Sequence, residues 1–523
     1  MSDFSNRLPR DLYRAAQVQQ LDQVAIKDFG IPGFKLMQTA GAACFDTLME
    51  AWPQTRHLLV FCGAGNNAGD GYIIAGLAKE QGIAAEVVQL SPGQNLKGDA
   101  ATAWQWALEK QVLTLTLSDL IKRQDSIHAN TVLVDALFGT GLDREVEGEY
   151  ASAIEFINQS DSPVLAVDIP SGLSADTGRA LGRAVVADIT VTFIGLKQGL
   201  LTNSGRDYIG QLIYHDLDVP PEIFHSESSP TASAQRIDIN YALQFLRPRA
   251  SSSHKGNHGH VVLIGGDYSY GGAIWMAAEA AQRSGAGLVS VITRSAHRPA
   301  ILARRPELMV MGTEDEGFHP DSMVGLLERA DALVLGPGLG RGQWSQQLFQ
   351  AALAVQSAGD IPLVIDADGL QLLADKGSPN ARLKRDNWIL TPHPGEASIL
   401  LGVSSEEIQR DRFESVSRLQ KKWGGACLLK GSGSLICTQE EGEQKLFLCS
   451  EGNPGMASGG MGDVLSGVIA GLLANEMSLE DSLCCAVCIH GEAADLSAQE
   501  LGAKGMAASD LFKYIRQLIN PSL

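Results

Sequence analysis

The sequence lacks any apolar run of 18 or more residues, so we expect no membrane-spanning helix. Its first residues, Met1-Ser2-Asp3-Phe4-Ser5, do not supply the apolar core of a signal peptide. Basic residues are scarce as well, since 41 lysines and arginines stand against 60 acidic residues, a net charge of −19. That balance disfavours nucleic acid as a partner. We therefore expect a soluble cytoplasmic protein. A small anionic ligand remains open, because backbone amides bind anions whatever the net charge.

Cysteine patterns that hold metals are also missing. Eight cysteines occur, mostly in apolar runs, and Cys485 and Cys488 have CxxC spacing. That pair lies in an apolar helical stretch with no second pair to complete a zinc site. We interpret the cysteines as reduced and buried.

What the chain does have is length and glycine. Its 523 residues suit two domains of about 200–300 residues each. The 56 glycines indicate many tight turns and close backbone approaches. A polar, turn-rich stretch at residues 223–253 predicts a linker, which leaves one domain at 1–222 and another at 254–523.

Both predicted domains alternate short apolar strands with helices, which is typical of an α/β fold with a parallel sheet covered on both faces. The halves show no sequence repeat, so we expect two different domains. Helices are expected at 72–81 and 273–284. Strands are expected at residues 58–62, 84–90, 131–137, 164–169, 189–194, 260–264, 288–293, 332–336, 363–366, 388–391 and 426–430.

The segment at residues 457–467 is the most informative one. Gly459, Gly460 and Gly462 precede an apolar run with helical spacing, which predicts a loop that opens a helix. Such a loop directs several backbone N–H groups at one place and favours bound anions. Asp463 is an unusual residue there, which indicates a base or an orienting group; the alternative is a helix cap.

Three strand ends of the first half carry polar side chains. A glycine- and asparagine-rich turn covers residues 65–71, Asp135 ends one strand, and Asp168 ends another shortly before Ser171. Carboxyl ends of parallel strands meet at one edge of the sheet, where ligands bind in such folds. Oxygen donors from three strand ends would suit a hard cation. The alternative is that each acid only caps the helix that follows.

Several motifs in series resemble one family. The first half is similar to the epimerase domain of NAD(P)HX repair proteins, and the second half to the matching dehydratase of the ribokinase-like superfamily. One departure is Gln38-Thr39 where the family usually has Glu-Asn. The motifs are Gln38-Thr39-Ala40-Gly41, residues 65–71, 135–141 and 168–172, His254-Lys255-Gly256, residues 336–340 and 391–396, and the loop at 457–467.

The resemblance implies a Rossmann-like three-layer sandwich followed by a ribokinase-like domain. It also implies repair of nicotinamide cofactors that carry water at C6 of the reduced ring, with NADHX and NADPHX as substrates. In the first domain it implies epimerisation with Asp168 in acid–base work, potassium near Asn67, Asp135 and Ser171, and an oligomer of identical subunits. The implied substrate contacts are Asn66, Asn67, Ala68, Gly69, Asp70, Gly139, Thr140, Gly141, Leu142, Asp143, Arg144, Glu145 and Asp168.

In the second domain the resemblance implies dehydration of the S epimer with ADP and Mg²⁺, the ligands of Mg²⁺ being left unassigned. Phosphorylation of the C6 hydroxyl would make it a better leaving group, the glycine loop would bind the transferring phosphoryl group, and Asp463 would take the hydroxyl proton. The implied hydrate contacts are Ala273, Gly338, His393 and Asp463. The implied nucleotide contacts are Lys430, Gly431, Ser432, Gly433, Ser434 and Gly462.

Two other functions remain open. A small-molecule kinase also uses a glycine loop that ends in an aspartate. The first half could instead be a dinucleotide-binding regulatory module. A plain NAD-dependent dehydrogenase is disfavoured, because Gly63-Ala64-Gly65 continues into two asparagines and not into a GxGxxG turn.

Overall fold

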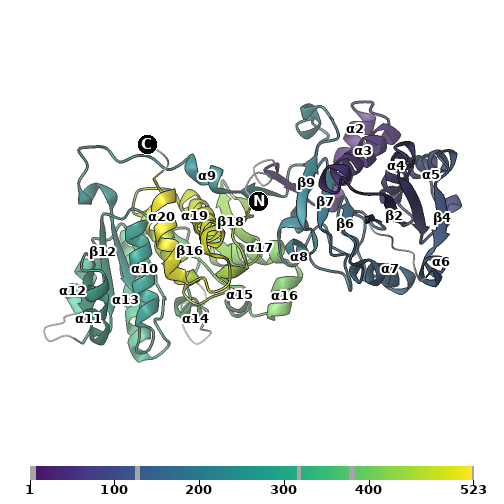
Figure 1. The fold of residues 1–523 in the computed structure, drawn as a ribbon. Coiled ribbons are helices and arrows are strands. Elements are labelled where there is room, and N and C mark those ends of the chain that lie inside the picture. Colours follow the sequence, from purple (N-terminus) through teal and green to yellow (C-terminus); the bar gives the residue numbers. More distant parts are fainter. Residues whose placement is uncertain (1–7, 124–129, 315–319, 376–382, 521–523) are drawn as a thin grey trace. The chain divides into compact units, whose positions relative to one another are not determined.

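The computed structural model describes residues 8–123, 130–314, 320–375 and 383–520. The chain forms two compact units, Met1–Gln235 and Arg236–Leu523. Both are built around largely parallel sheets with helices on their faces, which confirms the predicted α/β class (Figure 1). Among the described residues no helix combines the length and apolarity that a membrane span needs. The stretch predicted as a linker, 223–253, contains β10 (Ala234–Ile237) and α9 (Ile239–Leu243).

The N-terminal unit contains a seven-stranded sheet in which every neighbouring pair is parallel. The strand order reverses between β2 and β5, and such a reversal opens a crevice at the carboxyl ends of the strands. In the order in which they lie side by side, the strands are β4 (Leu113–Thr116), β3 (Ala84–Gln89), β2 (His57–Cys62), β5 (Thr131–Ala136), β6 (Val164–Val167), β7 (Ile189–Phe193) and β9 (Gln211–His215).

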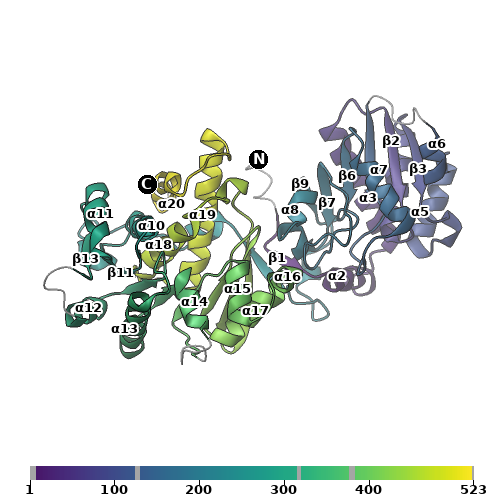
Figure 2. The same cartoon turned by 90° about the horizontal axis from the view of Figure 1, so that it is seen from below.

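Helices cover both faces of this sheet because its strands are apolar on both sides. Along β2, Leu58 and Val60 face one core while Leu59 and Phe61 face the other. The first core lies under α2 (Ala15–Lys27), α3 (Gly33–Ala51), α4 (Asn66–Glu80) and α5 (Gly98–Glu109), and the second under α6 (Leu117–Lys122) and α7 (Gly148–Asn158) (Figure 1). Figure 2 gives the view from below. A short strand, β8 (Leu196–Lys197), pairs with β1 (Asp11–Tyr13) beside the sheet.

The predicted start of the helix after β2 was wrong. We expected it at Tyr72, but α4 begins at Asn66. Gly69 and Gly71, which we interpreted as a sign of a loop, lie inside α4 and allow close packing there. A Cβ on Gly71 would approach Cys62 Sγ to 2.8 Å, and one on Gly69 would approach Met37 Sδ to 2.5 Å. The helix N-terminus therefore lies directly at the end of β2.

The C-terminal unit contains a second sheet, parallel from β13 across to β17 and followed by an antiparallel hairpin. The sequence did not predict the hairpin. In order across the sheet the strands are β13 (Met309–Gly312), β12 (Leu288–Thr293), β11 (His260–Ile264), β14 (Ala332–Leu335), β15 (Leu363–Ile365), β16 (Trp388–Leu390), β17 (Ala426–Leu429), β18 (Ser434–Glu440) and β19 (Glu443–Cys449).

Four helices of this unit form one core with the sheet: α10 (Gly271–Arg283), α18 (Met461–Leu473), α19 (Leu479–Leu501) and α20 (Leu511–Leu518). Helices α10 and α18 approach very closely, because a Cβ on Gly467 would lie 2.1 Å from the carbonyl oxygen of Ala277. The remaining helices are α11 (Arg298–Arg304), α12 (Pro320–Leu327), α13 (Gln343–Gly359), α14 (Asp368–Ala374), α15 (Pro394–Leu401), α16 (Ser405–Arg410) and α17 (Arg412–Trp423).

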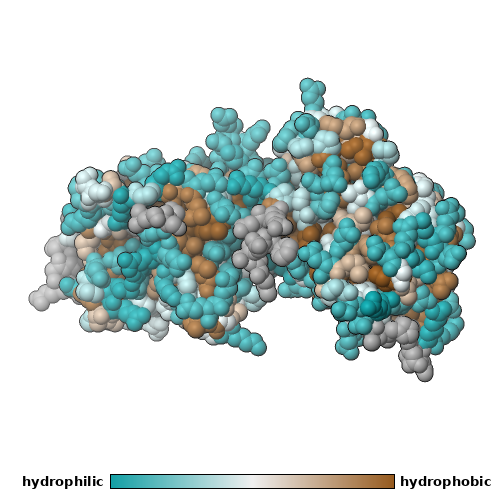
Figure 3. Space-filling view, turned by 45° about the horizontal axis from the view of Figure 1, so that its top comes forward, coloured by the Kyte–Doolittle hydropathy of each residue, from teal (hydrophilic) through white to brown (hydrophobic). Residues whose placement is uncertain are grey.

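The cysteines and the surface agree with the composition. All eight cysteines are buried and without disulfides. Cys488 lies beside Cys449 and Glu451, not in a site with Cys485. On the face that Figure 3 shows, hydrophilic residues cover most of both units and hydrophobic ones reach the surface in scattered patches.

Candidate active sites

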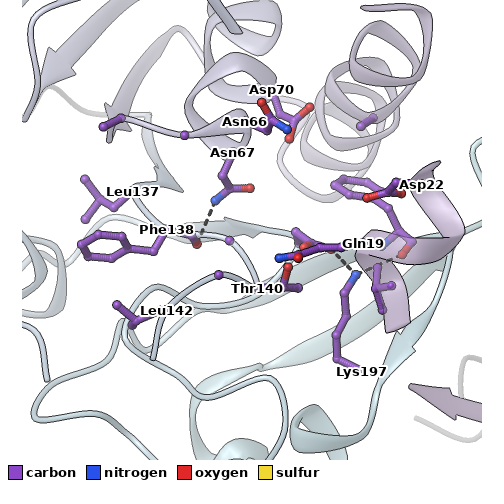
Figure 4. Close-up of a pocket in the computed structure, with 18 of the residues that line it drawn as sticks. Gln19, Asp22, Asn66, Asn67, Asp70, Leu137, Phe138, Thr140, Leu142 and Lys197 are labelled. Carbon is purple, nitrogen blue, oxygen red and sulfur yellow. Dashed lines mark hydrogen bonds and ion pairs between the residues drawn. The ribbon is translucent and has the colours of Figure 1, made fainter. Parts of the chain in front are cut away.

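The N-terminal unit has a cavity of about 1150 Å³ at the carboxyl edge of its sheet (Figure 4). Its walls come from α2 and α3, from the β2–α4 junction, from the loop after β5 and from the ends of β6 and β7. A dinucleotide-sized ligand fits such a volume. Of the residues predicted to contact substrate, those that line the cavity are Asn66, Asn67, Asp70, Gly139, Thr140, Gly141, Leu142, Asp143, Arg144, Glu145 and Asp168.

Two predicted contacts lie elsewhere. Ala68 is fully buried within α4, and Gly69 faces Met37 and Ala100. Both belong to the early turns of the helix, whose side chains pack against α3 and α5. Because the helix starts at Asn66 and not at Tyr72, the side chain of Ala68 and the Cα of Gly69 pack inside the protein, so a substrate contact at either position would use its backbone.

Asp168 is held by a buried lysine. Its backbone has a φ of 68°, a left-handed conformation that few residues other than glycine and asparagine or aspartate adopt. Its Oδ1 accepts hydrogen bonds from Lys197 Nζ and from the backbone N–H of Phe193. Lys197 is itself fully buried and also donates to Thr192 Oγ1 at 3.1 Å. The lysine therefore fixes the Asp168 carboxylate at the cavity wall.

Two further carboxyl groups gather around this pair. Asp22 of α2 lines the same cavity, and its pKa is raised to about 7 by burial and by Asp168, against the opposing effect of Lys197. Burial, Asp168 and Asp22 raise the pKa of Asp70 well above its usual value. Such a cluster of carboxyls around one lysine is typical of a site that moves protons.

Sequence reasoning missed Asp22 and Lys197. A signal for Asp22 was present, because it lies four residues after Val18 and three before Ala25, both buried, on the apolar stripe of its helix. Lys197 gave no comparable signal, since a lysine just after a strand is usually solvated.

The predicted cation ligands also come together. Asp135 accepts hydrogen bonds from Ser171 Oγ at 2.6 Å and from the backbone N–H groups of Ser171 and Leu137. Asn67 Nδ2 donates to the carbonyl oxygen of Phe138, and Ser171 Oγ accepts from the Phe138 N–H. Burial raises the pKa of Asp135 to about 6, although the three hydrogen bonds oppose this shift. The carboxylate of Asp135, the hydroxyl of Ser171 and the carbonyl of Phe138 bring oxygen atoms together here, and oxygen ligands fit a hard cation.

The C-terminal unit has a second polar cluster at the start of α18. Gly460, with a φ of 93°, is the residue before the helix, and Asp463 lies in the first turn. Lys430, at the end of β17, donates from Nζ to Asp366 Oδ1 at 2.8 Å, and Asp366 Oδ2 accepts from Ser466 Oγ at 2.8 Å. These contacts join the ends of two parallel strands to the helix, at the edge where ligands bind in such sheets.

The electrostatics of this cluster set Asp463 apart. Burial and the neighbouring Asp366 raise the pKa of Asp463 to about 7, with Lys430 opposing. Burial would also raise the pKa of Asp366, but Lys430 and hydrogen bonds outweigh it and lower that pKa. The site thus holds Asp366 ionised beside Lys430 and leaves Asp463 able to accept or release a proton near neutral pH.

Gly338 and Ala273 meet beside the α10 N-terminus. A Cβ on Gly338, whose φ is 59°, would lie 2.7 Å from the carbonyl oxygen of Tyr270 and 3.1 Å from the Ala273 Cβ. His393 caps α15, since its Nδ1 accepts from the backbone N–H groups of Gly395 and Glu396. Its side chain is 57% exposed, which leaves room for a ligand contact.

Lys430 begins the predicted nucleotide segment, which continues through Gly431, Ser432, Gly433 and Ser434. Arg412 supports this turn by donating to the carbonyl oxygens of Leu429 and Gly433, both at 3.3 Å. Gly462 approaches the same lysine, because a Cβ there would lie 3.2 Å from Lys430 Nζ. Glu396 also belongs to the cluster, because its Oε2 lies 3.8 Å from Lys430 Nζ. Sequence reasoning missed Asp366, Ser466 and Glu396, which lie far from Lys430 in sequence.

Comparison with known proteins covers both units. Residues 33–199 match the family model of the YjeF-related protein N-terminus, and residues 261–517 match the model described as NAD(P)H-hydrate dehydratase. The chain is 42% identical to the bifunctional NAD(P)H-hydrate repair enzyme Nnr of Coxiella burnetii, over 98% of this chain and 99% of that protein. It is 39% identical to the enzyme of the same name from Escherichia coli K12, over 99% of this chain and 95% of that protein.

A solved structure gives a partial match. It is the ADP/ATP-dependent NAD(P)H-hydrate dehydratase of Bacillus subtilis, co-crystallized with ATP/Mg²⁺. This chain shares 27% identity with it over 54% of this chain and 95% of that one, with a TM-score of 0.45.

Proposed function

Because the chain belongs to the family of bifunctional NAD(P)H-hydrate repair enzymes, we propose that its two clusters divide one repair reaction between them. The protein is an NAD(P)H-hydrate epimerase and dehydratase that acts on NADHX and NADPHX. The cavity with Asp168 interconverts the epimers, and the site of Asp463 dehydrates the S epimer with a nucleotide as co-substrate. The observation that supports this most is Asp463, an aspartate with a pKa of about 7 in the first turn of a helix that a glycine loop opens.

For the dehydratase we propose ADP as the phosphoryl donor. Asp463 takes the proton of the C6 hydroxyl while the hydroxyl oxygen attacks the β-phosphorus of ADP. The bond between this phosphorus and AMP breaks, and a phosphate ester forms at C6. The ester C–O bond then breaks to release phosphate, and loss of a C5 proton forms the C5=C6 bond of NAD(P)H. Backbone N–H groups of residues 459–462 stabilise the negative charge on the transferring group.

The other residues around Asp463 and Lys430 bind the two substrates and the metal ion. Lys430 and the turn through Gly431, Ser432, Gly433 and Ser434, together with Gly462, bind the nucleotide phosphates. Ala273, Gly338 and His393 bind the hydrate. Magnesium, when bound, neutralises nucleotide charge. The carboxylates of Asp366, Asp368 and Glu396 lie close enough to Asp463 to raise its pKa. Carboxylate oxygens are ligands of the type that Mg²⁺ takes, so the residues present fit this ion.

In the epimerase we propose that Asn66, Asn67, Ala68, Gly69, Asp70, residues 139–145 and Asp168 form the substrate site. Ala68 and Gly69 contribute through their backbone. Potassium fits the oxygen donors of Asn67, Asp135 and Ser171, where it would supply positive charge near the substrate. Asp168, held by Lys197, removes or returns a proton at the C6 hydroxyl.

We further propose that the protein works in the cytoplasm as a homo-oligomer. Its eight buried thiols without disulfides support a reducing compartment. The resemblance supports the oligomer, and the N-terminal helices, where Gln38 and Thr39 depart from the family pattern, would lie at the interface.

Product analysis tests the dehydratase against a small-molecule kinase. Purified S hydrate is incubated with the full chain, ADP and Mg²⁺, and the products are separated by chromatography. We expect NAD(P)H, AMP and free phosphate in equal amounts. A stable phosphorylated hydrate without NAD(P)H would favour the kinase.

A further inference from the structure

One end of the N-terminal cavity carries the carboxyl group of Asp22, to which the proposed epimerisation assigns no role. Asp22, Gln19 and Lys197 lie toward one end in Figure 4, and the apolar Leu137, Phe138 and Leu142 toward the other. Asp22 projects from α2, on which Val18, Gln19, Gln23 and Ile26 also line the cavity. The wall that α2 supplies is thus polar at Asp22 and faces the Asp168–Lys197 pair.

The surroundings of Asp22 differ from those of Asp168. Asp168 is paired with Lys197, whereas among the described residues Asp22 has no hydrogen-bond or ion-pair partner. The charged groups that act on it are Lys197 of β8 and Asp168. An unpaired carboxyl in a partly buried, acid-rich site is costly to ionise, which raises the pKa of Asp22.

The chemistry of epimerisation needs two such groups. C6 of the hydrate carries the hydroxyl and is bonded to the ring nitrogen. One group takes the hydroxyl proton, the C6–N1 electron pair moves to nitrogen, and a second group gives that nitrogen a proton, which leaves an aldehyde at C6. Rotation about the C5–C6 bond presents the other face of the carbonyl. Attack by nitrogen then reforms the C6–N1 bond, and both protons return, so atoms and electrons balance.

We propose that Asp22 is the second catalytic residue of the epimerase, donating a proton to the ring nitrogen while Asp168 takes the proton of the C6 hydroxyl. This assignment rests on the proposed epimerase function of the cavity. Two carboxyls in different surroundings are the usual basis of such an acid–base pair, and here Lys197 contacts Asp168 but not Asp22. The pKa of Asp22, about 7, lets it release and regain its proton near neutral pH. Asp70 lines the same cavity, and burial together with Asp168 and Asp22 raises its pKa as well.

The test uses the full chain without nucleotide, so that dehydration does not proceed. Purified S hydrate is incubated with wild-type protein or Asp22→Asn, and the R epimer that forms is measured by chromatography against a sample without enzyme. We expect Asp22→Asn to slow epimerisation at least about 100-fold. Dehydration of S hydrate after addition of ADP should be unchanged, because that reaction belongs to the other unit. Asp28→Asn, at the exposed end of the same helix, is the matched control and should epimerise at the wild-type rate.

A pH profile separates catalysis from a structural role. The wild-type rate should fall as the pH rises through about 7, because Asp22 then loses the proton that it donates. This limb should vanish in Asp22→Asn and persist, at reduced rate, in Asp22→Glu, which also serves if the asparagine variant does not fold. An Asp22→Asn rate within threefold of wild type, or a slow variant that keeps the limb, would overturn the proposal. A wild-type chain no faster than the enzyme-free sample would instead overturn the epimerase function itself.

Discussion

The carboxyl group of Asp463 costs stability where it lies. Its pKa rises from an ordinary 3.8 to about 7, chiefly through burial, so the folded protein binds this proton more tightly than the unfolded chain. The protonated group therefore stabilises the fold fully below about pH 4, and that contribution is lost as the pH rises through 7. A residue that destabilises the fold at the pH where it works is expected at a functional site.

Asp463→Asn should therefore separate activity from stability. We expect dehydration of S hydrate to fall by about 100-fold to 10,000-fold, because no base remains for the hydroxyl proton. At pH 8 the melting temperature should rise above that of wild type, and at pH 4 the two should differ less. Nucleotide-dependent formation of NAD(P)H measures the activity, and thermal unfolding at pH 4 and pH 8 measures the stability.

The matched control for that variant is Asp386→Asn, an exposed position in the same unit. It should change neither property. Wild-type dehydration should also increase as the pH rises through about 7, because Asp463 acts as a carboxylate. A pH profile that is flat between 6 and 8 would argue against Asp463 as the base.

Residues at strand ends could be predicted from the sequence because the alternation of strands and helices fixes where the carboxyl ends lie. Asp135 and Ser171 are an example, since both follow apolar strands and do meet. The hydrogen-bond partners of Asp366, Lys430 and Ser466, could not be predicted. Asp366 and Ser466 are 100 residues apart, and only the packing of α18 against the sheet brings them together.

At the scale of elements, glycines decide where backbone segments meet. The run from Gly65 to Gly71 was interpreted as a loop, because glycine disfavours helix interiors. Tertiary packing outweighs that preference, since side chains at Gly69 and Gly71 would overlap Met37 and Cys62. The β18–β19 hairpin was missed because its turn has no sequence signal stronger than Glu441-Gly442. Strands with long apolar runs, such as β2 and β11, were confirmed.

Gly338 tests how an element shapes the second site. Gly338→Ala should reduce dehydration at least about tenfold, because a Cβ meets the Tyr270 carbonyl oxygen at 2.7 Å and the left-handed φ costs about 1 kcal/mol. Epimerisation without nucleotide, carried by the other unit, should be unchanged. Gly342→Ala, where a Cβ has open space, should keep both activities. Loss of both activities in Gly338→Ala would show general unfolding and not a local effect.

At the scale of the whole molecule, each unit has its own sheet, its own core and its own polar cluster. The sequence predicted this division because the motifs fall in two series. It also predicted the fold class of each unit, since the strand pattern is parallel in both. Each unit can therefore carry one half of the repair, the epimerase supplying S hydrate to the dehydratase.

The most direct measurement of that division uses the full chain with a mixture of R and S hydrates, followed at the absorbance of the reduced nicotinamide. With ADP and Mg²⁺ we expect recovery of the whole mixture, in a fast phase for S and a slower phase for R, and no recovery without nucleotide. Recovery that stops when the S hydrate is consumed would contradict an active epimerase. Recovery that needs no nucleotide would contradict phosphorylation through Asp463.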